Sequence, residues 1–366
     1  MRLLIAVSQL ASKGGAERVV LNIAEHMSKK HAVTILTGNY DKNSTFDDFK
    51  KFKIISLNIK TKFFAIRQIL MFIKFSRLKF KGYDVINVHD FPATALSLRN
   101  KNVVWYCHTP PRLFYDLKDY ELKKVNVLLR PFAMLYVTVM RTIDKSLVKK
   151  IPIIIANSKN VQTRIKKFYH VDSRVIYPGV AVKKTEIRFE KFLLSVSRLF
   201  PEKRVDVAVQ AMKYRPEYKL FVVGDGPAKK SIEKIIARNK LNNVFLLGDV
   251  SEEKLSYLYR NCLAVVYIPI DEDFGLIPIE ANSHGKMVIG AREGGLKETI
   301  IHGETGLLID NPTPIKIARA IKKLEKIDPR THVKRCINHA KKFNLVNFNK
   351  KIEQTFAEFQ RVSFTA

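Results

Sequence analysis

The sequence predicts an α/β protein built from two doubly wound parallel sheets. At 366 residues the chain is longer than one hydrophobic core usually supports. Each half alternates short β-branched runs with segments of helical periodicity, which is the pattern of parallel strands joined by crossover helices. Pro178 and Gly179, followed by a charged stretch, separate the two halves. A content of 46% hydrophobic and 27% charged residues is that of a folded chain.

The expected strands of the first half cover residues 2–8, 31–37, 52–57, 83–89, 102–108 and 151–158, and those of the second half cover 191–198, 218–225, 243–249, 263–269 and 286–291. We predict an N-terminal domain over 1–185, a C-terminal domain over 186–345, and a final helix over 346–366 that packs back on the N-terminal domain. In open parallel sheets, ligands bind beyond the carboxyl ends of the strands. Functional residues are therefore expected directly after strands.

The cysteines predict a reducing, cytoplasmic location. Cys107, Cys262 and Cys336 are far apart and odd in number, so they provide neither a disulfide framework nor a CxxC metal site. The apolar N-terminal run is expected to be a buried first strand and not a signal sequence. The sequence contains no run of about 20 apolar residues, so no membrane-spanning helix is predicted. Residues 125–140 are expected to form a core or interface helix.

A net charge of +31 implies an anionic partner such as lipid headgroups, nucleic acid or a phosphorylated substrate. The segment from Lys50 to Lys81 contains no acidic residue and interleaves apolar side chains with cations. Such a helix fits peripheral docking at the cytoplasmic face of an anionic membrane, or else a core helix with a solvated basic face. Nucleic acid is disfavoured because no recognised motif is present. The candidate membrane or acceptor residues are Lys62, Phe63, Phe64, Arg67, Lys74 and Arg112.

Several turns that follow strands carry candidate site residues. Gly14 and Gly15 open a helix, which suits either a tight turn or the approach of a phosphate to free amides. His108 ends a strand and suits either a substrate contact or a capped loop. Arg198 and Lys203 suit a diphosphate clamp, whereas the nearby Arg204 is expected to be solvated.

Glu272 and Glu280 lie eight positions apart after the strand at 263–269. Glu272 is expected in a loop, and Phe274, Gly275 and Leu276 lead into a helix that carries Glu280. Two helical turns correspond to about 12 Å, which is too far for two carboxylates to act on one bond. The pair is therefore expected to contact two parts of an extended ligand.

The ordered set of motifs resembles the retaining glycosyltransferases of family 4. It includes "GGAERVVLNIA", "CHTPPR", "IIIANSKNVQTRIKKFY", "VIYPGV", "SRLFPEKRVD", "VVGDGP", the two glutamates, "GGLKETI" and "HGETGLL". The resemblance spans nearly the whole chain. It implies the GT-B fold, in which two Rossmann-like domains face each other across a cleft.

The resemblance also implies roles for individual residues. Glu280 would bind the ribose hydroxyls of the nucleotide, and Glu272 would bind the hydroxyls of the donor sugar. Arg198 and Lys203 would hold the diphosphate, and His108 would lie near the reaction centre. The catalytic set is thus His108, Arg198, Lys203 and Glu272, and the nucleotide-sugar set is Gly14, Gly15, Arg198, Lys203, Gly224, Phe274, Gly275, Leu276, Ile277 and Glu280.

The implied reaction moves a hexose from GDP-mannose or a UDP-hexose to a glycan or lipid-linked acceptor, with retention of configuration, in polysaccharide or glycoconjugate biosynthesis. The resemblance implies that neither a divalent metal nor another cofactor is needed. "HTPPRLFYD" and "EDFGLIPIEA" look most like the bacterial and archaeal mannosyltransferase branch. The alternatives are a sugar-nucleotide epimerase and a basic peripheral-membrane scaffold with an inactive GT-B fold.

Overall fold

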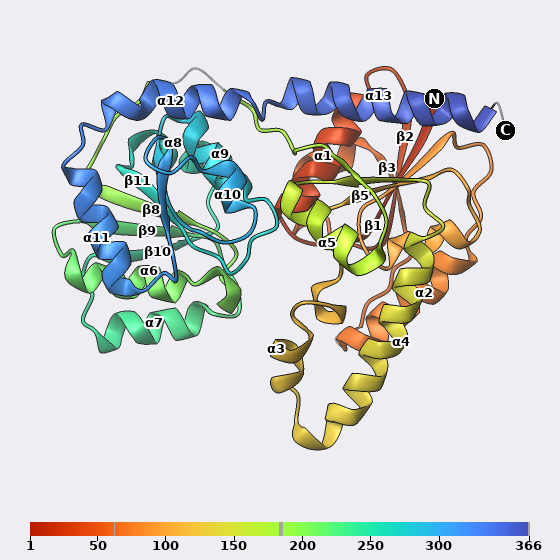
Figure 1. Ribbon diagram of the computed structural model, residues 1–366, viewed down its shortest axis with the longest axis horizontal. Coiled ribbons are helices and arrows are strands. Elements are labelled where there is room, and N and C mark those ends of the chain that lie inside the picture. The colour runs from red at the N-terminus through yellow and green to blue at the C-terminus, as the bar shows by residue number, and fades with distance from the viewer. Residues whose placement is uncertain (62, 183–185, 365–366) are drawn as a thin grey trace. The chain divides into compact units, whose positions relative to one another are not determined.

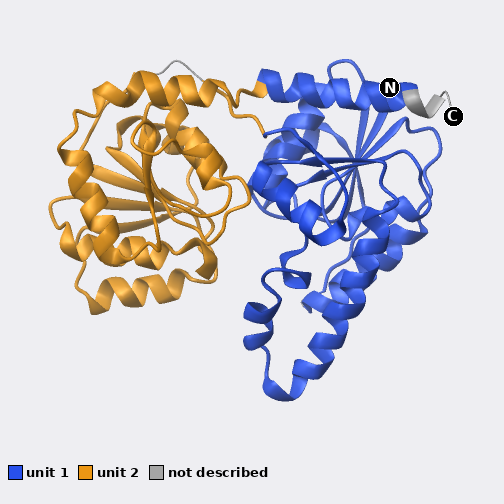
Figure 2. Ribbon diagram, viewed as in Figure 1, with its two compact units in different colours: residues 1–177, 346–366 blue, residues 178–345 orange. Residues whose placement is uncertain are grey.

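A computed structural model describes residues 1–61, 63–182 and 186–364. The chain forms two compact units, one made of Met1–Tyr177 with Val346–Ala366 and the other of Pro178–Leu345 (Figure 2). The first unit therefore ends before the predicted boundary at residue 185. The reason is that Val180 already pairs with the second unit: its amide donates to the carbonyl of Phe343 over 2.9 Å, and its carbonyl accepts from the amide of Leu345 over 3.1 Å.

Unit 1 contains a seven-stranded sheet in the order β3-β2-β1-β4-β5-β6-β7. Every pair of neighbouring strands is parallel. Its strands are β1 (Arg2–Leu10), β2 (Ala32–Tyr40), β3 (Lys53–Ser56), β4 (Val85–Val88), β5 (Val103–Cys107), β6 (Ile153–Ala156) and β7 (Arg174–Val175). The strand order reverses direction between β1 and β4, so ligands are expected beyond the carboxyl ends of these two strands.

The helices of unit 1 connect these strands and cover the sheet (Figure 1). They are α1 (Gly15–Met27), α2 (Phe64–Arg77), α3 (Lys118–Lys123), α4 (Arg130–Val148), α5 (Lys159–Tyr169) and α13 (Leu345–Phe364), with the short 3₁₀ turns η1 (Asp47–Lys51), η2 (Ala93–Leu98), η3 (Arg112–Phe114) and η4 (Val127–Leu129).

Unit 2 contains a six-stranded parallel sheet in the order β10-β9-β8-β11-β12-β13. Its strands are β8 (Phe192–Val196), β9 (Lys219–Val223), β10 (Val244–Gly248), β11 (Ala264–Tyr267), β12 (Met287–Ala291) and β13 (Gly306–Ile309). The switch point lies between β8 and β11. Its helical elements are η5 (Pro201–Lys203), α6 (Val205–Ala211), η6 (Met212–Tyr214), α7 (Lys229–Arg238), α8 (Glu252–Asn261), α9 (Leu276–Ser283), α10 (Leu296–Thr299), α11 (Pro314–Glu325) and α12 (Arg330–Lys341).

The predicted α/β class and the predicted strands are confirmed, and each unit is a doubly wound sheet. Strands β7 and β13 were not among the predicted strands. Strand β7 has only two residues, which is too short for a periodic pattern. Strand β13 follows the turn at Gly303 and reads "GLLI", a short apolar run that does not by itself distinguish a strand from a helix.

The last helix, α13, packs against unit 1 (Figure 2). Phe348, Ile352 and Phe356 recur at helical spacing and are buried, so one face of α13 is apolar. At the edge of this face, His26 and Glu353 form a hydrogen bond of 2.9 Å. The helix is therefore part of the packed body of unit 1.

The expectation for residues 125–140 is only partly met. Val137 and Met140 are buried, as expected for a core helix, but Leu128, Phe132 and Leu135 are exposed. The pattern is apolar on both sides of the helix, which sequence periodicity cannot distinguish from full burial. Within residues 1–61, 63–182 and 186–364, no helix combines the length and apolar content that crossing a bilayer requires. Cys107, Cys262 and Cys336 are buried free thiols.

Candidate active site

The carboxyl ends of β8 and β11 bring Lys203 and Glu272 together in unit 2. Lys203 ends η5, and its ammonium donates to Glu272 Oε2 over 2.6 Å. The hydroxyl of Tyr267, the last residue of β11, donates to the same oxygen over 3.0 Å. Burial and the negative charge of Glu272 raise the pKa of Tyr267 well above its usual range, so this hydroxyl stays protonated and donates. The cluster therefore fixes one carboxylate oxygen at the switch point.

Glu280 lies on α9, as predicted, and a second tyrosine orients it. The hydroxyl of Tyr259 on α8 donates to Glu280 Oε2 over 3.0 Å, and the Tyr259 ring stacks on His284 at a centroid distance of 5.2 Å. Burial and Glu280 raise the pKa of Tyr259 well above its usual range. Both predicted glutamates are thus held by tyrosine hydroxyls, a relationship that spacing along the sequence does not show.

Residues Asp271 to Gly275 form the loop that leads into α9, and the backbone of Gly294 and Gly295 packs against it. The amide of Gly295 donates to the carbonyl of Glu272 over 2.7 Å. A Cβ on Gly294 would lie 2.3 Å from that carbonyl oxygen. Gly275, at φ +89°, caps the start of α9. Glycine is needed at 294 and 295 because the backbone there meets the backbone of the loop that carries Glu272.

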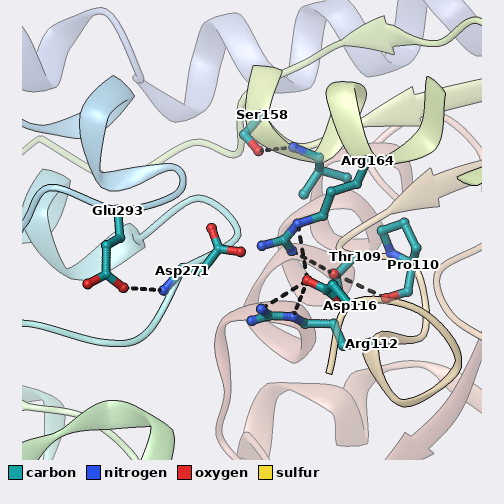
Figure 3. Close-up of polar contacts among 9 residues, drawn as sticks. Thr109, Pro110, Arg112, Asp116, Ser158, Arg164, Asp271 and Glu293 are labelled. Atoms are coloured by element: carbon teal, nitrogen blue, oxygen red, sulfur yellow. Dashed lines mark hydrogen bonds and ion pairs between the residues drawn. The ribbon is translucent and has the colours of Figure 1, made fainter. Parts of the chain in front are cut away.

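Arg204 is not solvated as the sequence suggested. Its Nη1 donates to Glu293 Oε1 over 2.8 Å. Glu293 Oε2 accepts from the backbone amide of Asp271 over 3.1 Å (Figure 3). Arg204 and Glu293 therefore anchor the start of the loop that carries Glu272. The pairing could not be predicted from the sequence, because 89 positions separate the two residues.

The other predicted residues of unit 2 differ in their surroundings. Arg198 is exposed beyond β8, with its guanidinium 5.3 Å from the centroid of the Phe200 ring. Gly224 has φ +118°, and a Cβ there would lie 2.1 Å from the carbonyl oxygen of Ser197. Phe274 is buried, whereas Leu276 and Ile277 are half-buried in the first turn of α9.

In unit 1, Gly14 and Gly15 begin α1 as predicted. Gly14 precedes the helix in an extended conformation, and a Cβ there would meet only the carboxylate of Glu17. That carboxylate accepts a hydrogen bond of 2.6 Å from the hydroxyl of Ser12. An acidic side chain thus lies at the helix start, where an anion is favoured by the helix dipole.

His108 follows β5, is half-buried, and is hydrogen-bonded to a chain formed by the buried residues His89 and Asn87. Its Nε2 lies 2.9 Å from Nδ1 of His89, and Nε2 of His89 lies 2.8 Å from Oδ1 of Asn87. The amide of Asn87 donates to the carbonyl of Val104 over 3.2 Å, which assigns Oδ1 as the acceptor for His89. His89 therefore carries its proton on Nε2 and accepts at Nδ1 from His108.

This chain leaves His108 neutral, with a lone pair on Nδ1. Burial lowers the pKa of His108 to about 4, and burial together with His108 lowers the pKa of His89 well below its usual range. Asp90, the residue after His89, accepts from the amide of Ser8 over 2.8 Å. Burial raises the pKa of Asp90 to about 7. His108 can thus accept a hydrogen bond from a ligand hydroxyl at Nδ1.

The candidate membrane or acceptor residues do not form one group. Lys62 lies outside the described residues. Phe63 and Phe64 are exposed at the start of α2, and Lys74 is exposed nearer its end. Arg67 lies with its guanidinium 5.8 Å from the centroid of the Phe64 ring. Arg112 instead follows β5 and forms an ion pair of 3.0 Å with Asp116, on which Arg164 also converges (Figure 3).

In the described parts of the chain, no cluster of three or more His, Cys, Asp or Glu side chains could hold a metal ion. Arg198 and Lys203 are the cations predicted to hold the diphosphate, and Lys203 pairs with Glu272.

Two family models together match residues 13–343 of the chain. Residues 13–184 match Glycosyltransferase Family 4, and residues 182–343 match Glycosyl transferases group 1. The α-1,3/1,6-mannosyltransferase ALG2 of Kluyveromyces lactis is 26% identical, and the alignment covers 81% of this chain and 71% of the relative. ALG2 of Mus musculus is 26% identical, with coverage of 85% and 84%.

Solved structures show the same fold. Sucrose-phosphate synthase from Thermosynechococcus elongatus has a TM-score of 0.81 at 20% identity and covers 99% of this chain and 100% of its own. HepE of Anabaena, solved with UDP and glucose, has a TM-score of 0.76 at 18% identity and covers 97% and 99%. The two parallel-sheet units and these matches define a glycosyltransferase of the GT-B fold. Within that class, the chain belongs to glycosyltransferase family 4.

Proposed function

We propose that this enzyme transfers a hexose from a nucleoside-diphosphate sugar to a glycan or lipid-linked acceptor, with retention of configuration. The observation that carries the proposal is the Lys203, Glu272 and Tyr267 cluster at the switch point of unit 2, with Glu280 on the helix that follows. Mannose is the first candidate sugar, because ALG2 relatives are named as mannosyltransferases. GDP-mannose and the UDP-hexoses are the candidate donors.

In this reaction the bond between the anomeric carbon and the diphosphate breaks, and a bond from that carbon to the acceptor oxygen forms. The acceptor proton leaves with the diphosphate. Negative charge grows on the leaving group, so fixed cations and helix amides aimed at it stabilise the transition state most. We assign this role to Arg198, Lys203 and the start of α9. Removing one such donor typically costs about 3 to 4 kcal/mol of activation free energy.

The glutamates are assigned to the uncharged parts of the donor. Glu280, held by Tyr259, accepts from the ribose hydroxyls, and Glu272, held by Tyr267, accepts from the sugar hydroxyls. The imidazole of His108 is neutral and has a lone pair on Nδ1, so we assign it to accept a hydrogen bond from a substrate hydroxyl. Because protein cations face the leaving group, the proposed reaction needs neither a metal nor another cofactor.

The acceptor is proposed to be presented at an anionic membrane surface. The support is α2, where exposed Phe63 and Phe64 lie in a segment that is basic from Lys50 to Lys81. A location on the cytoplasmic membrane face follows from the same proposal. Neither a nucleic-acid partner nor an inactive scaffold accounts for the oriented carboxylates of unit 2.

A donor-hydrolysis screen tests the proposal. Purified protein is incubated with GDP-mannose, UDP-glucose, UDP-galactose and UDP-N-acetylglucosamine, with and without EDTA, and nucleotide release is measured. We expect release from one donor that EDTA does not affect and that Glu280→Ala abolishes. If no donor is hydrolysed and none raises the melting temperature, the proposal fails. Formation of an epimeric nucleotide sugar would instead identify an epimerase.

A further inference from the structure

The outward side of η4 and α4 is apolar. Leu128, Phe132 and Leu135 have exposed fractions of 81%, 71% and 63%, and Val127 and Val139 are also exposed. We call these five residues the docking face. They recur at intervals of three and four residues along the helix, so the side chains from Leu128 to Val139 share one side of it. An arm formed by α3, η4 and α4 extends from the sheet of unit 1 and carries this face (Figure 1).

The other side of α4 is already used for packing. Val137, Met140 and Leu147 are buried in the core of unit 1. A helix that covers a soluble core normally has polar residues on its outer side. Between Val125 and Ile143, however, the charged residues are only Arg130 and Arg141. The docking face is therefore apolar without being needed for the core, and contiguous exposed apolar surface of this kind marks an interaction site.

Cations border the docking face. Lys123, the last residue of α3, and Lys124 are exposed shortly before η4, and Lys124 pairs with Glu121 over 2.8 Å. The guanidinium of Arg130 donates to the backbone carbonyls of Val125 and Lys123 over 3.1 and 3.2 Å, which ties the turn to the start of α4. An apolar side bordered by lysine and arginine matches the boundary between acyl chains and anionic headgroups.

A second copy of the chain fits this surface less well. A twofold contact through the docking face would bring identical patches together and place each set of cations near its copy. Like charges opposed across an interface cost binding free energy. With a net charge of +31, the chain also repels itself. The positive charges around the docking face therefore favour a negatively charged partner surface.

We propose that the docking face inserts into the outer part of an anionic lipid bilayer and so anchors unit 1 there. The apolar side chains enter about 5 to 10 Å into the headgroup and acyl boundary, while the flanking cations meet anionic headgroups. This anchor is distinct from the predicted contact of α2. Both α2 and α4 pack on η2, so the two helices belong to the same part of unit 1.

Vesicle co-sedimentation tests the proposal with the full chain. The vesicles contain phosphatidylcholine mixed with phosphatidylglycerol, or phosphatidylcholine alone. The double variant Phe132→Glu and Leu135→Glu is compared with Tyr257→Glu and Ile315→Glu, which changes the charge equally at exposed apolar residues of unit 2. We expect the first pair to weaken binding to the anionic vesicles about tenfold or more, and the control to bind nearly as the native chain does.

A second measurement detects insertion directly and does not rely on loss of binding. In Leu128→Trp, we expect anionic vesicles to shift the tryptophan fluorescence to shorter wavelength and brominated lipid to quench it. Neither change is expected for the tryptophan in Tyr257→Trp. Equal vesicle binding by the two double variants overturns the proposal. A native dimer that Phe132→Glu and Leu135→Glu dissociates overturns it in favour of a second copy. Donor hydrolysis by the double variant is expected to be unchanged, so the outcome is independent of the proposed reaction.

Discussion

Lys203 and Glu272 form an ion pair with a separation of 2.6 Å, in which the side chains are only 19% and 15% exposed. The cation assigned to the diphosphate and the carboxylate assigned to the sugar therefore hold each other before a donor binds. A largely buried cation needs a partner, and Glu272 supplies it. A diphosphate must compete with Glu272 for Lys203.

The variant Glu272→Gln should therefore bind nucleoside diphosphate more tightly than the native enzyme. The amide keeps the shape and can still accept from Tyr267, but the negative charge next to the diphosphate is lost. We expect the affinity for GDP or UDP, whichever the native enzyme releases, to rise about three- to tenfold, while donor turnover falls. Isothermal titration calorimetry measures the affinity.

The matched control for this prediction is Glu217→Gln. Glu217 pairs with Arg215 over 2.8 Å and precedes the amino end of β9, at the opposite end of the sheet from the site. The Glu217→Gln variant loses the same charge as Glu272→Gln, so a general electrostatic effect would raise the nucleotide affinity of both variants. An unchanged or lower affinity in Glu272→Gln would show that Lys203 does not exchange partners.

The hydrogen-bonded chain from Asn87 to His108 predicts the protonation state of His108. Since burial lowers its pKa to about 4, we expect a neutral imidazole with the proton on Nε2 throughout pH 5 to 8. Nitrogen-15 NMR of the two ring nitrogens measures this directly. As the pH falls through 4, His108 gains a proton and loses its acceptor, so kcat is expected to fall there. A titration of His108 near pH 6.5 would contradict the assignment.

Asn87→Leu tests what the chain does for catalysis. Without the acceptor at Asn87, His89 is no longer restricted to one tautomer, so the lone pair of His108 is no longer fixed. We expect kcat to fall about tenfold with little change in the KM for the donor. Asn100→Leu is the control, because Asn100 is also buried and donates to the carbonyls of Leu78 and Leu96 away from the histidines. Equal losses of kcat in both variants would indicate a general packing defect.

Tyr259→Phe should separate binding from chemistry in unit 2. The ring keeps its stacking on His284, and only the hydrogen bond to Glu280 is lost. A hydrogen bond to a charged group contributes about 1.5 to 3 kcal/mol, so we expect the KM for the donor to rise about ten- to a hundredfold with kcat nearly unchanged. Steady-state kinetics checks this. A fall in kcat at constant KM would place Glu280 nearer the reacting bond than the ribose.

The sequence predicted the parts of this enzyme that repeat along the chain. β-Branched runs with helical segments between them are sufficient for two doubly wound sheets, and residues after strands were correctly placed at the carboxyl ends. Contacts between positions far apart in the chain could not be predicted from the sequence. Tyr267 and Tyr259 read as ordinary strand and helix residues, although their hydroxyls orient Glu272 and Glu280.

Charges were hardest to interpret from sequence, because a charged residue looks the same whether it is solvated or paired. Arg204 was expected to be solvated but pairs with Glu293 and so supports the loop of Glu272. The apolar residues of α4 presented the same difficulty, since an apolar run is compatible with burial, with an interface or with a membrane surface.

Gly294 and Gly303 allow the effect of a close backbone contact to be separated from that of backbone conformation. Both have positive φ, at +52° and +82°. A Cβ on Gly294 would lie 2.3 Å from the carbonyl oxygen of Glu272, whereas a Cβ on Gly303 would meet nothing within 4 Å. Replacing either glycine with alanine puts a side chain on a left-handed residue, which lowers the stability of the fold by about 1 to 2 kcal/mol.

Gly294→Ala should therefore lose donor turnover, while Gly303→Ala should lose only stability. In Gly294→Ala, the loop from Asp271 to Gly275 must shift because a carbonyl oxygen cannot yield as a flexible side chain does, and Glu272 moves with it. Since a small misplacement of a substrate-positioning group is costly, we expect turnover to fall about a hundredfold. Gly303→Ala should keep near-native turnover with a lower melting temperature. Turnover and thermal melts of both variants check this, and equal turnover in the two would mean that the loop tolerates displacement at Glu272.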